Sequence, residues 1–141
     1  MTNVTLAQSY LIKARKRLKI LPVLLEENAY SDVIREAQEI VELATKGMLR
    51  QVGIEPPKWH DVGDLLIEFA ERIQSVNLDE LEHLANVSHW LRKEREFSFY
   101  GDVDFIPTEQ YSREDAVRAI KDAHSVVEAA SRVIALPDES A

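Results

Sequence analysis

Apolar residues recur every three or four positions along most of this chain, as at Leu11, Ala14, Leu18, Leu21 and Leu25. One face of an α-helix presents residues at that spacing, so each such segment predicts an amphipathic helix. The four glycines and five prolines lie mostly between these segments. No segment shows the apolar and polar alternation of a half-buried strand. We therefore expect an all-α protein built as a helical bundle.

The pattern divides the chain into five helices joined by short links, which favours an up-and-down arrangement. Pro22 removes a backbone donor and crowds the preceding turn, so the first helix should kink or restart there. Ser31 has a side chain suited to a helix N-cap. Pro56 and Pro57 must lie in a loop. The expected helices span about residues 5–27, 31–52, 62–74, 78–98 and 113–136.

Capping side chains precede the later helices. Asp61 is placed to cap the third helix, and Asn77 or Asp79 to cap the fourth. Ser112 and Asp115 resemble a capping box at the start of the fifth helix, with Asp in place of the usual Glu.

The fifth helix carries one apolar stripe, which we expect to face the core. His124 shares this stripe, so we expect it to be a hydrogen-bonded core or interface histidine. The stripe consists of Val117, Ile120, His124, Val127, Ala130 and Ile134.

Size and composition exclude several classes of protein. With 141 residues and 45% hydrophobic content, the chain has room for one domain, residues 1–141, with a single core. It has no cysteine for disulfides or thiolate metal sites, and no apolar run of about 18 residues. We expect a soluble cytoplasmic protein that does not enter a membrane. Because the formal charge is -8, any nucleic-acid contact would need a local basic patch.

Arg92 and Arg95 leave the fourth helix on the side of its buried leucines. At 100° per residue, each lies within about 40° of Leu81 around the helix axis. A buried guanidinium needs an acidic partner or an anionic ligand. The arginines therefore either form internal ion pairs, overhang the core, or line a cleft or dimer seam that receives phosphate. The acids available for internal pairing are Glu36, Glu39 and Asp102.

A set of short motifs occurs in a particular order along the chain. They are Y-L-x-x-A at residues 10–14, A-x-E-x-V-E-L-A-x-K-G-M-L at 37–49, W-H-D-V-G-D-L-L at 59–66 and R-x-x-R-E-x-x-F-Y-G-D at 92–102. In this order they resemble a HEPN domain, and the resemblance covers nearly the whole chain. It implies a five-helix domain resembling a four-helix bundle, and a homodimer whose seam we expect to include the fourth helix and the loop after it. It also implies nucleotide or RNA binding, and a minimal nucleotidyltransferase as partner in a toxin and antitoxin pair.

The resemblance also locates a departure from the family's ribonucleases, which use an Arg, four to six intervening residues and a His. Arg95 matches the arginine, but the histidine window holds Tyr100, Gly101 and Asp102, and counting from Arg92 reaches residues 97–99, also without His. A tyrosine with a pKa near 10 is a poor base at pH 7. We therefore expect a non-catalytic module whose ligand-binding residues are Arg92, Arg95, Tyr100 and Asp102. The alternatives are a divergent metal-independent ribonuclease using Arg92, Arg95 and Tyr100, and a structural interaction bundle without a ligand.

Two histidine motifs are similar to motifs of known metal sites. His60 and Asp61 are similar to the dyad of metal phosphohydrolases, and Glu80 with His83 has the Glu-x-x-His spacing of di-iron bundles. The first needs further ligands and the second needs a second copy, which the other histidines do not supply. We expect no metal and no cofactor.

Two further clusters stand out. Lys13, Lys16 and Arg17 share a face of the first helix, which is ordinarily a solvated surface. If RNA or an acidic partner binds outside the arginine cleft, we expect this outer basic patch to take part. Aromatic residues near the fourth helix would pack in a core or dimer seam, or stack on a base. These are Trp59, Trp90, Phe97, Phe99, Tyr100 and Phe105.

Overall fold

The computed structural model describes residues 4–56, 58 and 62–137. Over these residues the chain forms helices joined by turns and loops, and no β-strand, so the expected all-α fold is confirmed. The elements are α1 (Leu6–Leu18), α2 (Leu21–Glu26), α3 (Tyr30–Gln51), α4 (Val62–Glu68), the 3-10 turn η1 (Ala70–Arg72), α5 (Leu78–Phe99), α6 (Pro107–Gln110) and α7 (Arg113–Val133).

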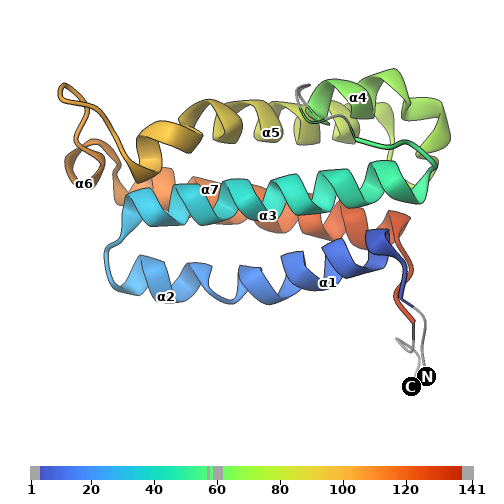
Figure 1. Ribbon diagram of the computed structural model, residues 1–141, viewed down its shortest axis with the longest axis horizontal. Coiled ribbons are helices and arrows are strands. Elements are labelled where there is room, and N and C mark those ends of the chain that lie inside the picture. Colours follow the sequence, from blue (N-terminus) through green and yellow to red (C-terminus); the bar gives the residue numbers. More distant parts are fainter. Residues whose placement is uncertain (1–3, 57, 59–61, 138–141) are drawn as a thin grey trace.

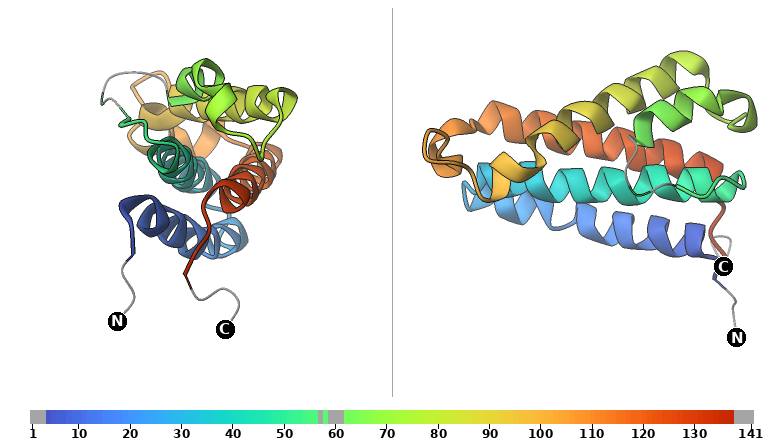
Figure 2. Two further views of the ribbon diagram at one scale, coloured as in Figure 1. Left: turned by 90° about the vertical axis from the view of Figure 1, so that its right-hand side faces the viewer. Right: turned by 45° about the horizontal axis from the view of Figure 1, so that its top comes forward.

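The central helix of the bundle is α3, which packs against α1, α5 and α7. In Figure 1, α1 and α2 run along one side of α3, α5 along the other, and α7 lies behind it. The end-on view of Figure 2 shows α1 and α2 in one column and α3, α5 and α7 as three more. The short helix α4 packs on α5. The architecture thus resembles a four-helix bundle, in which α1 and α2 together take one helix position and short helices are added.

The first expected helix is divided at Pro22, as predicted. α1 ends at Leu18, and α2 begins at Leu21 with Pro22 in its first turn, where a missing backbone donor costs least. After α2, Asn28 adopts a φ of 59° and turns the chain toward α3. Short polar residues such as Asn tolerate this left-handed conformation best among residues other than glycine.

Several predicted boundaries are wrong. Ser31 does not cap α3, because the helix already begins at Tyr30 after Ala29, and Ser31 is buried inside it. The third expected helix stops at Glu68, since Phe69 leaves helical geometry and a 3-10 turn follows. The last helix stops at Val133, where Ile134 becomes extended. The loop expected after α5 contains α6.

Two predicted caps are confirmed. Ser112 Oγ accepts from the Asp115 backbone N–H, and the Asp115 carboxylate accepts from the Ser112 N–H, completing the capping box. Asn77 Oδ1 accepts from the Glu80 N–H at the start of α5. Asp61 lies outside the described residues.

The buried face of α7 differs from the predicted stripe. Val127, Ala130 and Ile134 are buried as predicted, but Val117 is 45% exposed and His124 is exposed. His124 is therefore not a core histidine, and the alternative that it lies in an interface stays a prediction. The helix instead turns small side chains inward, which lets its backbone approach α3 closely. The buried residues of α7 are Ala116, Ala119, Ala123, Val126, Val127, Ala129 and Ala130.

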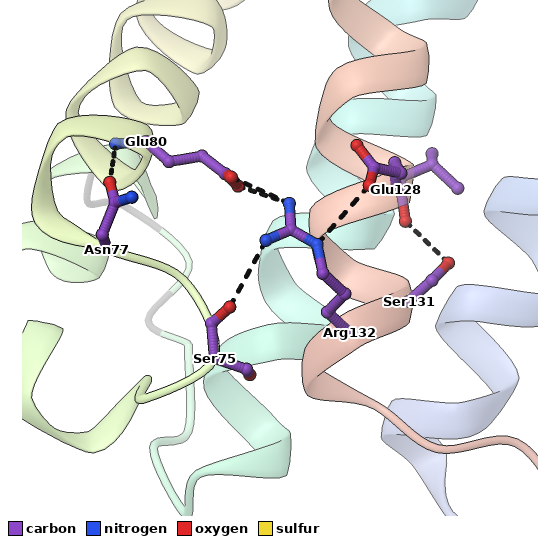
Figure 3. A network of polar contacts seen from close by, with 7 residues as sticks. Ser75, Asn77, Glu80, Glu128, Ser131 and Arg132 are labelled. Atoms are coloured by element: carbon purple, nitrogen blue, oxygen red, sulfur yellow. Dashed lines mark hydrogen bonds and ion pairs between the residues drawn. The ribbon is translucent and has the colours of Figure 1, made fainter.

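Arg132 ties the end of α7 to the start of α5 (Figure 3). Its Nη2 atom donates to both carboxylate oxygens of Glu80, and Nη1 donates to the Ser75 carbonyl at 3.3 Å. The Glu128 carboxylate, one turn back on α7, lies 3.5 Å from Arg132 Nε. Hydrogen bonding to Glu80 raises the pKa of Arg132, so the guanidinium remains charged. This network fixes α7 against the η1–α5 turn.

Candidate functional site

Arg92 and Arg95 lie on the strip of surface along which α3 and α5 pack side by side. This strip, which also carries Glu39 and Glu42 of α3, is called the α3–α5 groove from here on. Because the helices run antiparallel, residue numbers rise along α3 as they fall along α5. Arg92 Nη1 lies 3.7 Å from Glu42 Oε1, and Arg95 Nη2 lies 3.9 Å from Glu39 Oε1. The groove is therefore bordered by opposite charges at ion-pair distance.

The two arginines are less buried than the leucines of α5. Leu84 and Leu91 are fully buried, whereas the side chain of Arg92 is 32% exposed and that of Arg95 is 52% exposed. Two of the three expected explanations of the arginines hold in part, because each arginine meets an acid and Arg95 is also half exposed. The third, a cleft or dimer seam that receives phosphate, stays a prediction. The acid near Arg92 is Glu42, which the sequence analysis did not name.

A third arginine joins this groove from α3. Arg35 Nη2 lies 3.2 Å from Glu39 Oε1, and its guanidinium carbon lies 5.5 Å from the ring centroid of Phe99. Glu39 is thus shared between Arg35 and Arg95. Arg35 is not among the site residues predicted from the sequence. Its position four residues before Glu39 places the two side chains on one helix face, and this spacing could have predicted their contact.

Three guanidinium groups and two carboxylates meet at this surface. Arg35 and Arg95 lie at ion-pair distance from Glu39, and Arg92 lies at ion-pair distance from Glu42. The next glutamate toward the start of α3, Glu36, is occupied by Arg17 of α1, whose Nε donates to Glu36 Oε1 at 2.7 Å. The Arg17 hydrogen bond is short, whereas the contacts of Glu39 and Glu42 with α5 are 3.9 and 3.7 Å. The α3–α5 groove is the part better suited to receiving an anion.

Tyr100 and Asp102 lie beyond the end of α5. Tyr100 is 78% exposed, and its ring packs edge-on against Phe99 at a centroid distance of 4.8 Å. Asp102 exchanges backbone hydrogen bonds with Phe105, and its carboxylate accepts from the Val103 N–H. Among the described residues, the contacts of these two side chains are thus with the loop and Phe99. Tyr100 remains accessible, and Asp102 shapes the turn.

The remaining aromatic residues form a row on the α7 side of the loop. Phe105 packs between Phe97, at 5.3 Å, and Tyr111, at 5.6 Å between ring centroids. The Tyr111 hydroxyl donates to Glu94 Oε2 at 2.8 Å. Burial, followed by this hydrogen bond, raises the pKa of Tyr111 above its ordinary value. Trp90 donates its indole N–H to Asp122 of α7 and lines the same hollow as Phe105 and Tyr111. Trp59 is outside the described residues.

The outer basic patch is divided in the structure. Lys13 and Lys16 are exposed on α1. Arg17 instead directs its guanidinium to Glu36 through two hydrogen bonds, and the first of these raises the Arg17 pKa. The two lysines are therefore the cations that α1 offers to solvent at this patch.

The Glu80 and His83 motif does not form a metal site in the described part of the chain. The Glu80 carboxylate is bound by Arg132, and His83 is exposed. Over residues 4–56, 58 and 62–137, no group of three or more His, Asp or Glu side chains could hold a metal ion. His60 and Asp61 lie outside this part. Nor is any helix of the same residues long and apolar enough to cross a membrane.

Comparison with known proteins places these observations in a family context. The protein-family model described as "HEPN domain" matches residues 7–133 of this chain. A curated relative from Methanocaldococcus jannaschii, named "Putative toxin MJ1304", is 29% identical over 134 residues, which covers 89% of this chain and 86% of the relative. The match spans the helices that form the α3–α5 groove.

Proposed function

The chain belongs to the HEPN domain family, and from that premise we propose that it is a toxin-like module that binds a nucleotide or RNA without cleaving it. Arg95 carries this proposal. Its guanidinium is half exposed and lies 3.9 Å from Glu39, longer than a charged hydrogen bond. A phosphate approaching from solvent therefore meets a guanidinium that need not first be released from a tight pair.

The neighbours of Arg95 suit the same ligand. Arg35 adds a second guanidinium on the α3 side, while Phe99 and Tyr100 present rings that are 52% and 78% exposed. Guanidinium groups bordered by accessible aromatic rings are the usual combination for single-stranded nucleic acid, since phosphates meet the cations and bases stack on the rings.

The absence of catalysis follows from the residue types. Binding a phosphate needs only cations, whereas cleaving RNA requires a group that takes a proton from the attacking hydroxyl. The five to seven positions after Arg95 supply Tyr100, Gly101 and Asp102 in place of histidine. Tyr100, which is exposed, does not supply the imidazole that the family's ribonucleases use for this proton transfer.

The partner in this proposal is a small nucleotidyltransferase that acts as the antitoxin. The resemblance to HEPN domains that sit beside a nucleotidyltransferase supports this partner, and the name of the archaeal relative supports only the toxin side of the pair. Co-expression of the chain with any small nucleotidyltransferase encoded beside it, followed by affinity capture and gel filtration, tests this part. Separate elution of the two proteins at micromolar concentration would contradict it.

The module acts as a homodimer in this proposal. The last turn of α5 and the loop after it expose several large apolar side chains, as surfaces that bind a partner often do. They are Phe97 at 42%, Phe99 at 52%, Val103 at 88% and Ile106 at 43% exposure. Light scattering at tens of micromolar should give twice the 16.1 kDa chain mass, and a monomer mass would remove the shared seam.

A paired assay tests binding against cleavage. Single-stranded RNA is incubated with the protein in EDTA, and the same RNA is then titrated by fluorescence anisotropy. We expect saturable binding and intact RNA. Metal-independent cleavage that disappears in Arg95→Ala would replace this proposal with a ribonuclease, and failure of both RNA and mononucleotides to bind would leave a structural bundle.

A further inference from the structure

Two adjoining hollows lie on the opposite side of α5 from the arginine groove, and they share Arg118 of α7. The first hollow has a volume of about 270 Å³, and its lining includes Trp90, Glu94, Phe105, Tyr111, Asp115 and Arg118. The second has a volume of about 410 Å³ and is lined by Arg113, Glu114, Val117, Arg118 and Lys121. The first is aromatic and acidic, whereas the second has a mainly apolar surface, with two arginines and a lysine among its lining residues.

The rings of the first hollow are held in fixed orientations. The Trp90 indole N–H donates to Asp122 Oδ2 at 3.0 Å, and the Tyr111 hydroxyl donates to Glu94 Oε2 at 2.8 Å. Preorganised rings lose little conformational freedom when a flat ligand stacks on them. The hollow is therefore built to receive a planar group.

Trp90 already stacks with a planar group of this chain. The guanidinium carbon of Arg118 lies 4.2 Å from the centre of the Trp90 ring. The Arg118 side chain is 63% exposed, and its Nε lies 3.7 Å from Asp122. An exposed arginine held by stacking and a long ion pair moves at small cost, so it can turn toward an incoming anion while the ring accepts another planar group.

The acids of the first hollow select the edge of that planar group. Among the described residues, Tyr111 is the hydrogen-bond partner of the Glu94 carboxylate, so acceptor capacity remains. The guanine edge presents an N–H and an amino group side by side, which together match one carboxylate. Adenine, cytosine and uracil present no such pair of adjacent donors. The hollow volume of about 270 Å³ leaves room for a purine ring.

The second hollow supplies charge for the phosphate. Arg113, Arg118 and Lys121 are all exposed on the outer face of α7, and Arg118 also borders the first hollow. A nucleotide with its base in the first hollow would thus direct its phosphate to three cations. We propose that the two hollows form a guanine nucleotide subsite, with the base on Trp90 and Glu94 and the phosphate on Arg118 and Lys121.

This subsite rests on the proposed nucleotide or RNA binding but is separate from the arginine groove. Trp90 contacts Asp122 of α7, whereas Arg92 and Arg95 contact glutamates of α3. The two faces of α5 can therefore be tested independently. Trp90 fluorescence reports the subsite, and the affinity difference for RNA between the parent and Arg95→Ala reports the groove.

The test uses a Trp59→Phe background, so that Trp90 is the single tryptophan. Guanosine monophosphate should quench its fluorescence saturably, at least about tenfold more tightly than adenosine, cytidine or uridine monophosphate. Glu94→Gln should weaken guanosine monophosphate binding by about tenfold. Glu82→Gln, an exposed change elsewhere on α5, should leave it unchanged. Circular dichroism confirms that each variant is folded.

A second variant isolates the phosphate contact. In the parent, guanosine monophosphate should bind more tightly than guanosine, and this difference should largely disappear in Arg118→Ala combined with Lys121→Ala. Equal affinity for all four mononucleotides, no saturable quenching at millimolar concentration, or quenching by spermidine but not by the guanine nucleotide would each overturn the subsite. Loss of the Arg95 dependence of RNA binding would instead count against the proposed function alone.

Discussion

Arg95 Nη2 and Glu39 Oε1 lie 3.9 Å apart across the α3–α5 groove. Glu36 lies one turn before Glu39 on α3, and it pairs with Arg17 of α1. Arg17 Nε lies 2.7 Å from Glu36 Oε1, and a second hydrogen bond joins the same two side chains at 3.2 Å. Two arginine–glutamate pairs on neighbouring turns of α3 thus differ in kind. The pair made by Arg17 fastens α1 to α3, while the pair made by Arg95 is loose and exposed.

Replacing Arg95 by Ala should affect binding more than stability. The side chain is 52% exposed, so its ion pair contributes little to folding and the melting temperature should change by only a few degrees. RNA or nucleotide affinity should fall by about 1.5–3 kcal/mol, the effect of a charged hydrogen bond. Arg95→Lys should recover part of this, because an ammonium lacks the planar fork. Calorimetry measures the melting temperature and titration measures the ligand affinity of the same Arg95→Ala sample. A strongly destabilised variant would indicate a structural role of Arg95 instead.

Replacing Glu39 by Gln should strengthen anion binding. Glu39 is the carboxylate shared by Arg35 and Arg95, and it competes with any phosphate for them. The amide keeps the shape of the side chain but removes its charge, so RNA affinity should rise several-fold at low salt, and the gain should shrink as salt increases. Exposed Glu82→Gln, outside the groove, serves as control. A weaker RNA complex in Glu39→Gln would contradict the groove assignment.

Tyr111→Phe should change the alkaline stability profile. Burial and Glu94 raise the pKa of Tyr111 above the ordinary value of a tyrosine, which is about 10. The unfolded chain then ionises first, so the stabilisation from Tyr111 is present below about pH 10 and is lost as pH rises past 10 toward the folded pKa. The free energy of unfolding should fall more steeply above pH 10 in the parent than in Tyr111→Phe. The two proteins contain the same lysines, so the comparison isolates the effect of Tyr111. Denaturant titrations at pH 8 to 11 measure this, and parallel profiles would exclude the effect.

Arg132 should contribute to stability through Glu80 rather than Glu128. Its side chain is 40% exposed, so after solvent screening we expect Arg132→Ala to cost only about 0.5–1 kcal/mol. Glu80→Gln should cost a similar amount and Glu128→Gln almost nothing, because the Glu128 side chain is 74% exposed. Thermal unfolding in low and high salt compares them. An equal loss of stability in the Glu80 and Glu128 variants would contradict a stabilising contact between Arg132 and Glu80, the contact to α5 drawn in Figure 3.

Gly101→Ala should disrupt the loop after α5 more than Gly53→Ala disrupts the end of α3. Both glycines have positive φ, 69° and 86°, so both substitutions carry backbone strain of about 1 kcal/mol. A Cβ at Gly101 would also lie 2.5 Å from Pro107 Cδ and collide with the Phe105 carbonyl, whereas one at Gly53 meets nothing within 4 Å. Chemical denaturation should rank Gly101→Ala as the less stable, and the opposite order would contradict this loop geometry.

The sequence by itself determined the helical elements, because the signals for them act within one or two turns. The restart at Pro22 and the capping box of Ser112 and Asp115 depend on residues at most a few positions apart, and both are present in the structure. The order of the motifs likewise indicated the family. Ser31 shows the limit of such signals, since a good capping side chain is buried in α3 when the turn at Asn28 starts the helix earlier.

Tertiary structure alone decided which side chains meet. The rotation of α7 about its axis is set by how closely its alanines pack on α3, and this put Val117 and His124 on the surface, although they lie at the spacing of an apolar stripe. The pairing of Arg92 with Glu42, and of Trp90 with Asp122, depends on the relative register of separate helices. A helical period of 3.6 residues fixes which residues share a face, but only packing between helices determines what that face contacts.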